Sequence, residues 1–200
     1  MSAIIYIEGG GDHNENLATQ FRRSWKKFFE AADLQGNLPR VVRGGSRDDT
    51  FKRFASAVRH PEPKRLPLLL VDSEDAINAE QSVWSFLQIH DGWTKPEVAT
   101  EGQAFLMVQT METWLVADRT SFQRYFGPNF NAAALPNWQN LEAVPKRDLF
   151  ESIKKATRQC STPYAKGKVS FELLAAIQPQ QVSAACPHAK RLLDHLAQAG

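Results

Sequence analysis

Short apolar runs alternate with amphipathic segments along the first half of the chain. Such runs are typical of strands buried on both faces of a sheet, whereas the segments between them repeat apolar residues at helical spacing. The predicted strands are 3–7, 38–42, 68–71 and 104–108, and the first predicted helix carries its apolar stripe at Leu17, Phe21, Trp25, Phe28, Phe29 and Ala32. The alternation predicts an α/β fold with a mainly parallel four-stranded sheet flanked by helices.

The remaining helices follow from similar signals. Ser46 lies three residues before Asp49, a capping-box pattern that predicts a helix start. Apolar residues at Val83, Trp84 and Leu87 predict another helix. Beyond about Asp118 the strand signal fades, and the predicted helices are 149–156, 169–177 and 189–197. We therefore expect one domain over residues 1–200, with an α/β core over 1–118 and a mainly helical C-terminal part over 119–200.

Composition and charge exclude several classes of protein. The N-terminal apolar run is too short for a signal peptide, and no segment approaches the ~18 apolar residues of a membrane span, so we expect a cytoplasmic protein without a membrane partner. Cys160 and Cys186 belong to no metal or redox motif and are predicted to be reduced and structural. A net charge of +2 is too small to indicate nucleic-acid binding, so local clusters must carry that argument.

Acidic residues follow three of the predicted strands. Glu8 ends the first strand, Asp72, Glu74 and Asp75 follow the third, and Glu112 follows the fourth. Because the carboxyl ends of parallel strands share one sheet edge, these side chains are expected to meet there. Carboxylate oxygens are the ligands that Mg²⁺ or Mn²⁺ prefers. The alternative is that each acid stabilises a helix N-terminus by up to ~1 kcal/mol.

Two of these segments resemble a known family. Residues 7–12, Ile-Glu-Gly-Gly-Gly-Asp, are similar to the E-G-x-x-[ED] opening of TOPRIM domains in OLD-type nucleases, and residues 71–75 resemble their D-x-D motif, with Glu74 in place of aspartate. The resemblance implies Glu8 as a catalytic proton-transfer group and metal ligand, and Asp12, Asp72 and Glu74 as metal ligands. Asp75 could compensate for the longer Glu74, and Glu112 would be an auxiliary catalytic ligand.

Further motifs resemble the DUF4276 family, a TOPRIM-like group of bacterial proteins. They are Arg43-Gly44-Gly45, the segment 111–118 and Tyr164-Ala165-Lys166. This resemblance implies a four-stranded parallel core and a Mg²⁺-dependent nuclease. It also implies an ABC-type or OLD-like ATPase as partner, in anti-phage defence.

Basic residues near these motifs are candidates for substrate binding. Lys166 and Lys168 lie in a loop that enters a predicted helix, where lysine supplies a mobile charge for phosphate, and Arg43 opens one of the family motifs. A plain surface loop is the alternative for both lysines. The glycines at 9–11 are not followed by Gly-Lys-[Ser/Thr], so a nucleotide-hydrolysing P-loop is not expected.

Two functions of different classes remain open from the sequence. One is a Mg²⁺- or Mn²⁺-dependent endonuclease of DNA or RNA, in which water attacks a phosphodiester in line. The other is a catalytically inactive module that docks a partner ATPase, since a fold alone does not grant activity.

Overall fold

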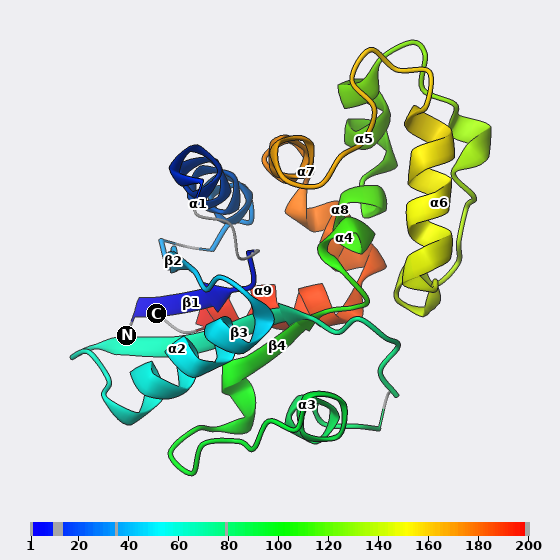
Figure 1. Cartoon of the computed structure of the whole chain (residues 1–200). Coiled ribbons are helices and arrows are strands. Elements are labelled where there is room, and N and C mark those ends of the chain that lie inside the picture. Colours follow the sequence, from blue (N-terminus) through cyan, green and yellow to red (C-terminus); the bar gives the residue numbers. More distant parts are fainter. Residues whose placement is uncertain (1, 10–13, 35, 79, 199–200) are drawn as a thin grey trace.

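The computed structural model describes residues 2–9, 14–34, 36–78 and 80–198. Its centre is an all-parallel four-stranded sheet in the order β2-β1-β3-β4 (Figure 1). The strands are β1 (Ser2–Ile7), β2 (Arg40–Arg43), β3 (Arg65–Asp72) and β4 (Ala104–Met107). The predicted fold class and all four predicted strands are confirmed, although β2 begins two residues later than the sequence pattern indicated.

Helices connect the strands and form the C-terminal part. They are α1 (Glu15–Glu30), α2 (Arg47–Arg59), α3 (Val83–Asp91), α4 (Met111–Ala117), α5 (Arg119–Phe126), α6 (Lys146–Thr157), α7 (Lys168–Leu174), α8 (Pro179–Ala185) and α9 (Pro187–Gln198). Short 3-10 turns occur at Glu101–Gln103, Ala132–Ala134 and Leu141–Ala143. The sequence pattern missed α4, α5 and α8. Five successive residues of α4 are buried, so this helix shows no amphipathic stripe.

Polar side chains begin the first two helices. The Asn14 side chain accepts a hydrogen bond from the Leu17 N–H at 3.1 Å. At α2, Ser46 Oγ accepts from the Asp49 N–H at 3.2 Å, so the predicted helix start is confirmed. Each contact satisfies one of the backbone donors that a helix N-terminus leaves without a partner.

The sheet separates two hydrophobic clusters. On one face, β1, β3 and β4 pack with α1 and with helices of the C-terminal part, and on the other they pack with α2 and α3 (Figure 1). The larger cluster continues from Ile5 and Phe105 in the strands to Leu149 and Leu192 in α6 and α9. The C-terminal helices therefore share their core with the sheet.

The chain reverses its winding between β1 and β3. The connection after β1 crosses one face through α1, whereas the connection after β3 crosses the other face through α3 (Figure 1). The two strands are neighbours, with Ile7 beside Leu70. Connections that leave adjacent strands toward opposite faces open a crevice at the carboxyl ends, which is where ligands bind in open α/β sheets.

Two further expectations concern the surroundings of the protein. Across the part of the chain that the structure describes, no helix combines the length and the apolar character needed to cross a bilayer. Cys160 and Cys186, which are predicted to be structural, are both buried and form no disulfide.

An aromatic cluster joins α1 to α4. The Trp25 ring is fully buried, lies edge-on to Trp114 with centroids 5.8 Å apart, and stacks on Phe29 at 5.6 Å. Aromatic contacts of this geometry stabilise the fold by more than the burial of their apolar surface alone. The cluster therefore ties the sheet-covering helix α1 to the C-terminal helices.

Removing this ring should destabilise the protein strongly. Trp25→Ala is expected to lower the free energy of unfolding by about 3–5 kcal/mol, because it leaves a large cavity in the core. Trp138→Ala is the matched control, since Trp138 is only partly buried against the same cluster and should cost clearly less. Urea unfolding measures both, and equal losses would contradict the central place of Trp25.

Candidate functional site

A cavity of about 340 Å³ opens at the carboxyl ends of β1, β3 and β4. Four carboxylates line it, from Glu8, Asp72, Glu74 and Glu112, and they are called the acid rim below. The other lining residues are Gly9, Leu17, Phe21, Arg43, Met107, Met111, Lys166, Gly167, Ser170 and Phe171. Three separate strand ends thus deliver acids to one hollow.

Asp72 is the acid at the carboxyl end of β3. Its Oδ1 accepts a hydrogen bond from the Met111 N–H at 2.9 Å, which fixes the carboxylate between β3 and α4. Burial raises the pKa of Asp72 well above its ordinary value, and the neighbouring carboxylates of Glu112, Glu8 and Glu74 raise it further. Such crowding of like charges in a cleft marks functional sites.

Glu8 lies directly beyond β1. Its N–H donates to the Leu70 carbonyl at 3.1 Å, so the parallel pairing with β3 continues to this residue. Burial raises the pKa of Glu8, the Arg47 guanidinium 3.3 Å away lowers it, and Glu74 raises it again. The net shift is upward, as expected for a carboxyl group that holds its proton more tightly than in water.

Arg47 is a site residue that the sequence interpretation missed. Its guanidinium makes two hydrogen bonds to Asp91, at 2.7 and 2.8 Å, and donates to both Glu8 and the backbone carbonyl of Asp72. It also lies 5.1 Å from the centroid of the Trp93 ring. Only its place directly after the Ser46 cap could have drawn attention to it, because Asp91 is far away in the sequence.

Glu112 is held by Tyr164. The phenol donates to Glu112 Oε1 at 2.5 Å, and only 2% of Glu112 is exposed. Burial and the adjacent Glu112 carboxylate raise the pKa of Tyr164, so the phenol stays protonated and continues to donate. Tyr164 belongs to a segment that resembles the family motif, but the sequence analysis predicts no role for it.

Glu74 is paired with Lys146, a second residue that the sequence interpretation missed. The Lys146 ammonium donates to Glu74 Oε2. The backbone of Glu74 has φ of 66°, and its N–H donates to the Gln109 carbonyl at 2.8 Å. The Gln109 side chain in turn accepts from the Lys146 N–H at 3.0 Å. The first residue of α6 is therefore tied directly to the acid rim.

Two of the three predicted substrate-binding residues line the cavity, and the third lies outside it. Arg43 and Lys166 line the cavity, and Arg43 Nε donates to the Gly9 carbonyl at 2.8 Å. Lys168 lies outside it, in a groove between α1 and α7, where its ammonium is 3.9 Å from Glu172. Of the two lysines, Lys166 has the position expected for a group that approaches phosphate at the rim.

Some of the predicted metal ligands line the cavity and one does not. Asp75 does not line the cavity: its side chain is 76% exposed and faces His90 at 3.5 Å. Asp12 lies outside the described residues. Glu8, Asp72 and Glu74 all line the same cavity.

The acid rim has the donor chemistry of a site for a hard cation. Carboxylate oxygens suit Mg²⁺ and Mn²⁺. Burial and repulsion between carboxylates both raise the pKa of Asp72, and a cation would relieve the repulsion. Within residues 2–9, 14–34, 36–78 and 80–198, no three Asp, Glu, His or Cys side chains form a ready-made metal site. Arg47 and Lys146 already hold Glu8 and Glu74, so these carboxylates would have to exchange partners to reach a metal.

Comparison with known families shows to which family the chain belongs. The family model described as "Domain of unknown function (DUF4276)" matches residues 7–197. The chain belongs to the DUF4276 family. Neither the curated proteins nor the solved structures contain a match to it. The matched region of this DUF4276 protein includes every residue of the acid rim together with Tyr164 and Lys146.

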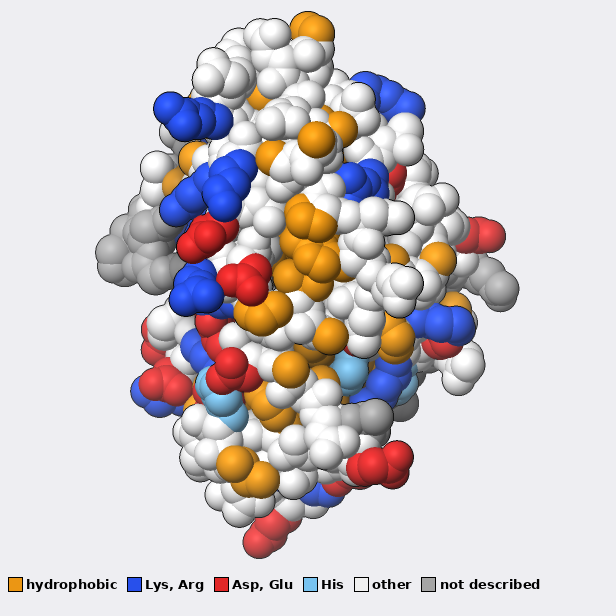
Figure 2. All heavy atoms as spheres, turned by 90° about the vertical axis from the view of Figure 1, so that its right-hand side faces the viewer, with side chains coloured by type: hydrophobic (Ala, Val, Ile, Leu, Met, Phe, Trp, Pro, Cys, Tyr) orange, Lys and Arg blue, Asp and Glu red, His pale blue; other side chains and the backbone are white. Residues whose placement is uncertain are grey.

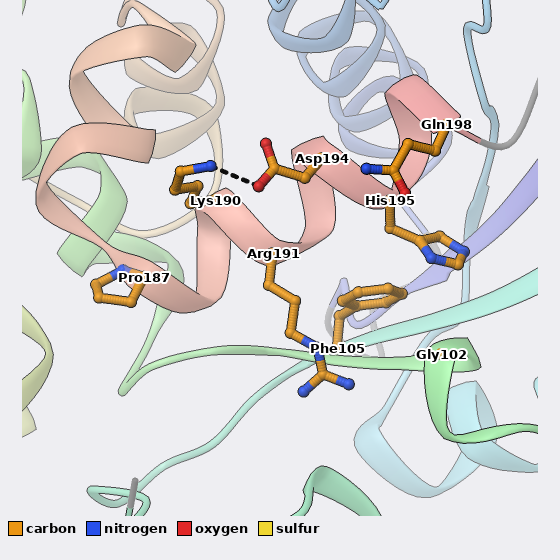
Figure 3. A pocket seen from close by; sticks show the side chains of 8 residues that line it. All are labelled: Gly102, Phe105, Pro187, Lys190, Arg191, Asp194, His195 and Gln198. Atoms are coloured by element: carbon orange, nitrogen blue, oxygen red, sulfur yellow. Dashed lines mark hydrogen bonds and ion pairs between the residues drawn. The ribbon is translucent and has the colours of Figure 1, made fainter.

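A larger hollow of the DUF4276 protein lies at the other end of the sheet (Figure 3). It measures about 390 Å³, and Gly102, just before β4, forms part of its wall. Lys190 is paired with Asp194 at 2.5 Å, while Arg191 and His195 point toward Phe105 (Figure 3). Because functional crevices of parallel sheets lie at the carboxyl ends, the acid rim is the better candidate.

The raised pKa of Asp72 predicts a pH-dependent stability. The folded protein binds the Asp72 proton more tightly than the unfolded chain, so ionising this group costs stability as the pH rises above about 4. Asp72→Asn keeps the acceptor for the Met111 N–H and should be more stable than wild type at pH 7, with the gain shrinking toward pH 4. Urea unfolding at both pH values measures this.

Asp75→Asn is the matched control for that measurement, because Asp75 is exposed and outside the rim. Its effect on the free energy of unfolding should be small at both pH values. A gain for Asp72→Asn that is the same at pH 4 and pH 7 would show that Asp72 titrates normally.

Loss of the Tyr164 hydroxyl should be costly because it leaves a buried carboxylate without its donor. Tyr164→Phe is expected to lower the free energy of unfolding by about 1–3 kcal/mol. In the control Tyr125→Phe, the hydroxyl also donates to a glutamate at 2.5 Å, but that partner, Glu172, is 37% exposed and can turn to water. Urea unfolding of both variants should rank them in this order; the reverse order would contradict the buried pairing of Glu112.

Proposed function

We propose that this DUF4276 protein is a metal-dependent nuclease of the TOPRIM type that cleaves phosphodiester bonds in DNA or RNA. The observation that carries the proposal is the acid rim: carboxylates from three strand ends line one cavity, and burial together with their mutual repulsion raises the pKa of Asp72. A protein tolerates such a cost where the charges serve a ligand. Mg²⁺ or Mn²⁺ is the proposed cofactor.

Each acid of the rim has a proposed role. Glu8 is the proton-transfer group, since its raised pKa brings it closer to the pH at which general acid–base catalysis is most effective. Asp72 and Glu74, together with Asp12, are the proposed metal ligands, and Glu112, held by Tyr164, is an auxiliary one. When bound, the divalent ion supplies charge that stabilises the phosphate as it reacts.

The cations of the cavity are suited to hold the substrate. Arg43 and Lys166 line the same hollow as the acids, so a phosphate there would have positive charge beside it. Lys166 lies close enough to lower the pKa of Asp72. Arginine offers a planar fork to phosphate oxygens and lysine a mobile point charge.

The proposal extends to a relationship and a partner. The motifs at residues 7–12 and 71–75 resemble those of OLD-type TOPRIM nucleases. We therefore propose an ABC-type or OLD-like ATPase as the partner of this protein and anti-phage defence as its setting.

A second candidate function is a docking module without catalysis. The observation in its favour is that Arg47 and Lys146 already hold two of the rim carboxylates. In that case the acids and cations form a structural network, and the fold serves as a scaffold for the partner ATPase.

The variant Glu8→Gln distinguishes the two. It keeps the size of the side chain and its capacity to hydrogen-bond to Arg47 but removes the charge, so a catalytic role predicts a cleavage rate ~10²-fold or more below wild type. The melting temperature should change little. The assay is cleavage of mixed DNA and RNA substrates with Mg²⁺ or Mn²⁺, with and without a co-encoded ATPase.

Asp75→Asn is the control, because it removes an exposed carboxylate of the same segment that lies outside the cavity. It should cleave at about the wild-type rate. Cleavage by Glu8→Gln at the wild-type rate would refute the proposed mechanism. If neither the wild type nor any variant shows metal-dependent cleavage, the docking module is favoured.

A further inference from the structure

One face of α6 runs from the acid rim to a second hollow. Lys146, Phe150, Lys154 and Arg158 are each four residues apart, and successive residues at this spacing are neighbours in one row along the helix surface. They are called the α6 track below. Its first residue pairs with Glu74 of the rim, and its last residue is the C-cap of the helix. At about 1.5 Å per residue, the track is about 18 Å long.

The far end of the track opens into a hollow of about 330 Å³. Its lining residues are Lys154, Lys155, Thr157, Arg158, Pro163 and Tyr164, and they include three cations and no acid. This group is called the basic hollow below. Neither Lys154 nor Arg158 has an ion-pair partner among the residues that the structure describes. Their charges are therefore available to an anionic ligand.

The walls of the basic hollow are largely apolar. The long stems of lysine and arginine side chains cover apolar surface while their charged ends stay in water. Here these stems stand beside the Pro163 ring and the partly buried Tyr164 ring. A hollow with an apolar wall and a cationic edge matches a nucleotide, whose base is apolar on its faces and whose phosphate is an anion.

Tyr164 joins the basic hollow to the acid rim. Its ring lines the hollow, and its hydroxyl donates to Glu112. Its centroid is 6.3 Å from that of Phe150, and the Lys166 ammonium lies 4.9 Å from the Phe150 centroid. Aromatic and basic groups therefore continue along the track between the two sites.

The exposed side of the molecule agrees with this arrangement. Figure 2 views the structure from the side on which α6 lies in Figure 1, and several Lys and Arg side chains line the upper part of that face. On α6 itself, Lys154 and Arg158 are exposed. A strand of nucleic acid could reach them without displacing any element.

We propose that the α6 track and the basic hollow bind a single strand of nucleic acid, with one base against Pro163 and Tyr164 and the adjacent phosphates on Lys154 and Arg158. A single strand is required because the base faces of a duplex are stacked and cannot enter a hollow. The inference rests on the proposed function only for the next step, in which the strand continues past Phe150 and Lys166 to the acid rim.

The test measures binding without cleavage. Fluorescence anisotropy with a labelled mixed-sequence single strand, in buffer containing EDTA, compares wild type with the double variant Lys154→Gln/Arg158→Gln. The variant should bind about tenfold or more weakly, and the slope of log K against log salt should become shallower by about 1.4, because two phosphate contacts are lost at ~0.7 each. A duplex of the same sequence should bind more weakly than the single strand to wild type.

Lys52→Gln/Arg59→Gln is the matched control, since it removes an exposed lysine and an exposed helix-terminal arginine from α2, across the sheet. It should keep the wild-type affinity and slope. The proposed binding along the α6 track would be overturned by an unchanged salt slope for Lys154→Gln/Arg158→Gln. It would also be overturned by an equal loss of affinity in the control. Circular dichroism of each variant shows that the fold persists.

Two further probes test the occupant of the hollow. A strand that lacks its bases should bind about fivefold or more weakly than the intact strand, because base stacking is lost. Equal binding of that strand, of the duplex or of poly-glutamate would overturn the proposal and make the face a general site for anions. Because EDTA prevents metal-dependent cleavage, this assay measures binding alone. A protein that binds the strand in EDTA but does not cleave nucleic acid with Mg²⁺ or Mn²⁺ would refute the nuclease and leave this inference standing.

Discussion

The parallel pairing of β1 with β3 is the constraint on which the rest of the structure depends. The pairing places Ile7 beside Leu70 and continues through the hydrogen bond from the Glu8 N–H to the Leu70 carbonyl. Glu8 and Asp72 therefore leave the sheet at the same edge. Because α1 and α3 cross opposite faces, the space above this edge stays open for a ligand. A shift of the register would separate the two acids.

Gathering carboxylates at that edge costs free energy, and the fold offsets it with groups from distant segments. Arg47 from the start of α2 reaches Glu8, Lys146 from the start of α6 reaches Glu74, and Tyr164 donates to Glu112. Asp72 Oδ1 accepts a hydrogen bond from the Met111 N–H, but burial and the neighbouring carboxylates keep the pKa of Asp72 well above its ordinary value. This unequal compensation is the physical basis of the metal-dependent activity proposed for the site.

The C-terminal helices are part of this site and not an appendage to the sheet. They share the hydrophobic cluster of α1 and the strands, and the aromatic contact between Trp25 and Trp114 links the two parts. Through that shared core, α6 and the loop before α7 are fixed beside the acid rim. The basic and aromatic face of α6 thus gains a defined direction toward the acids, which an independent helical domain would lack.

The sequence by itself determined the strands, their alternation with helices and the acids at the strand ends, because buried parallel strands are continuous apolar runs and end where polar residues begin. It also identified Lys166, which lines the cavity. Only the tertiary structure decided that Asp75 and Lys168 face elsewhere and that Arg47, Lys146 and Tyr164 hold the acids. The physical reason is that periodicity reports burial along one element, whereas these contacts join residues of separate elements, whose meeting is set by packing across the sheet.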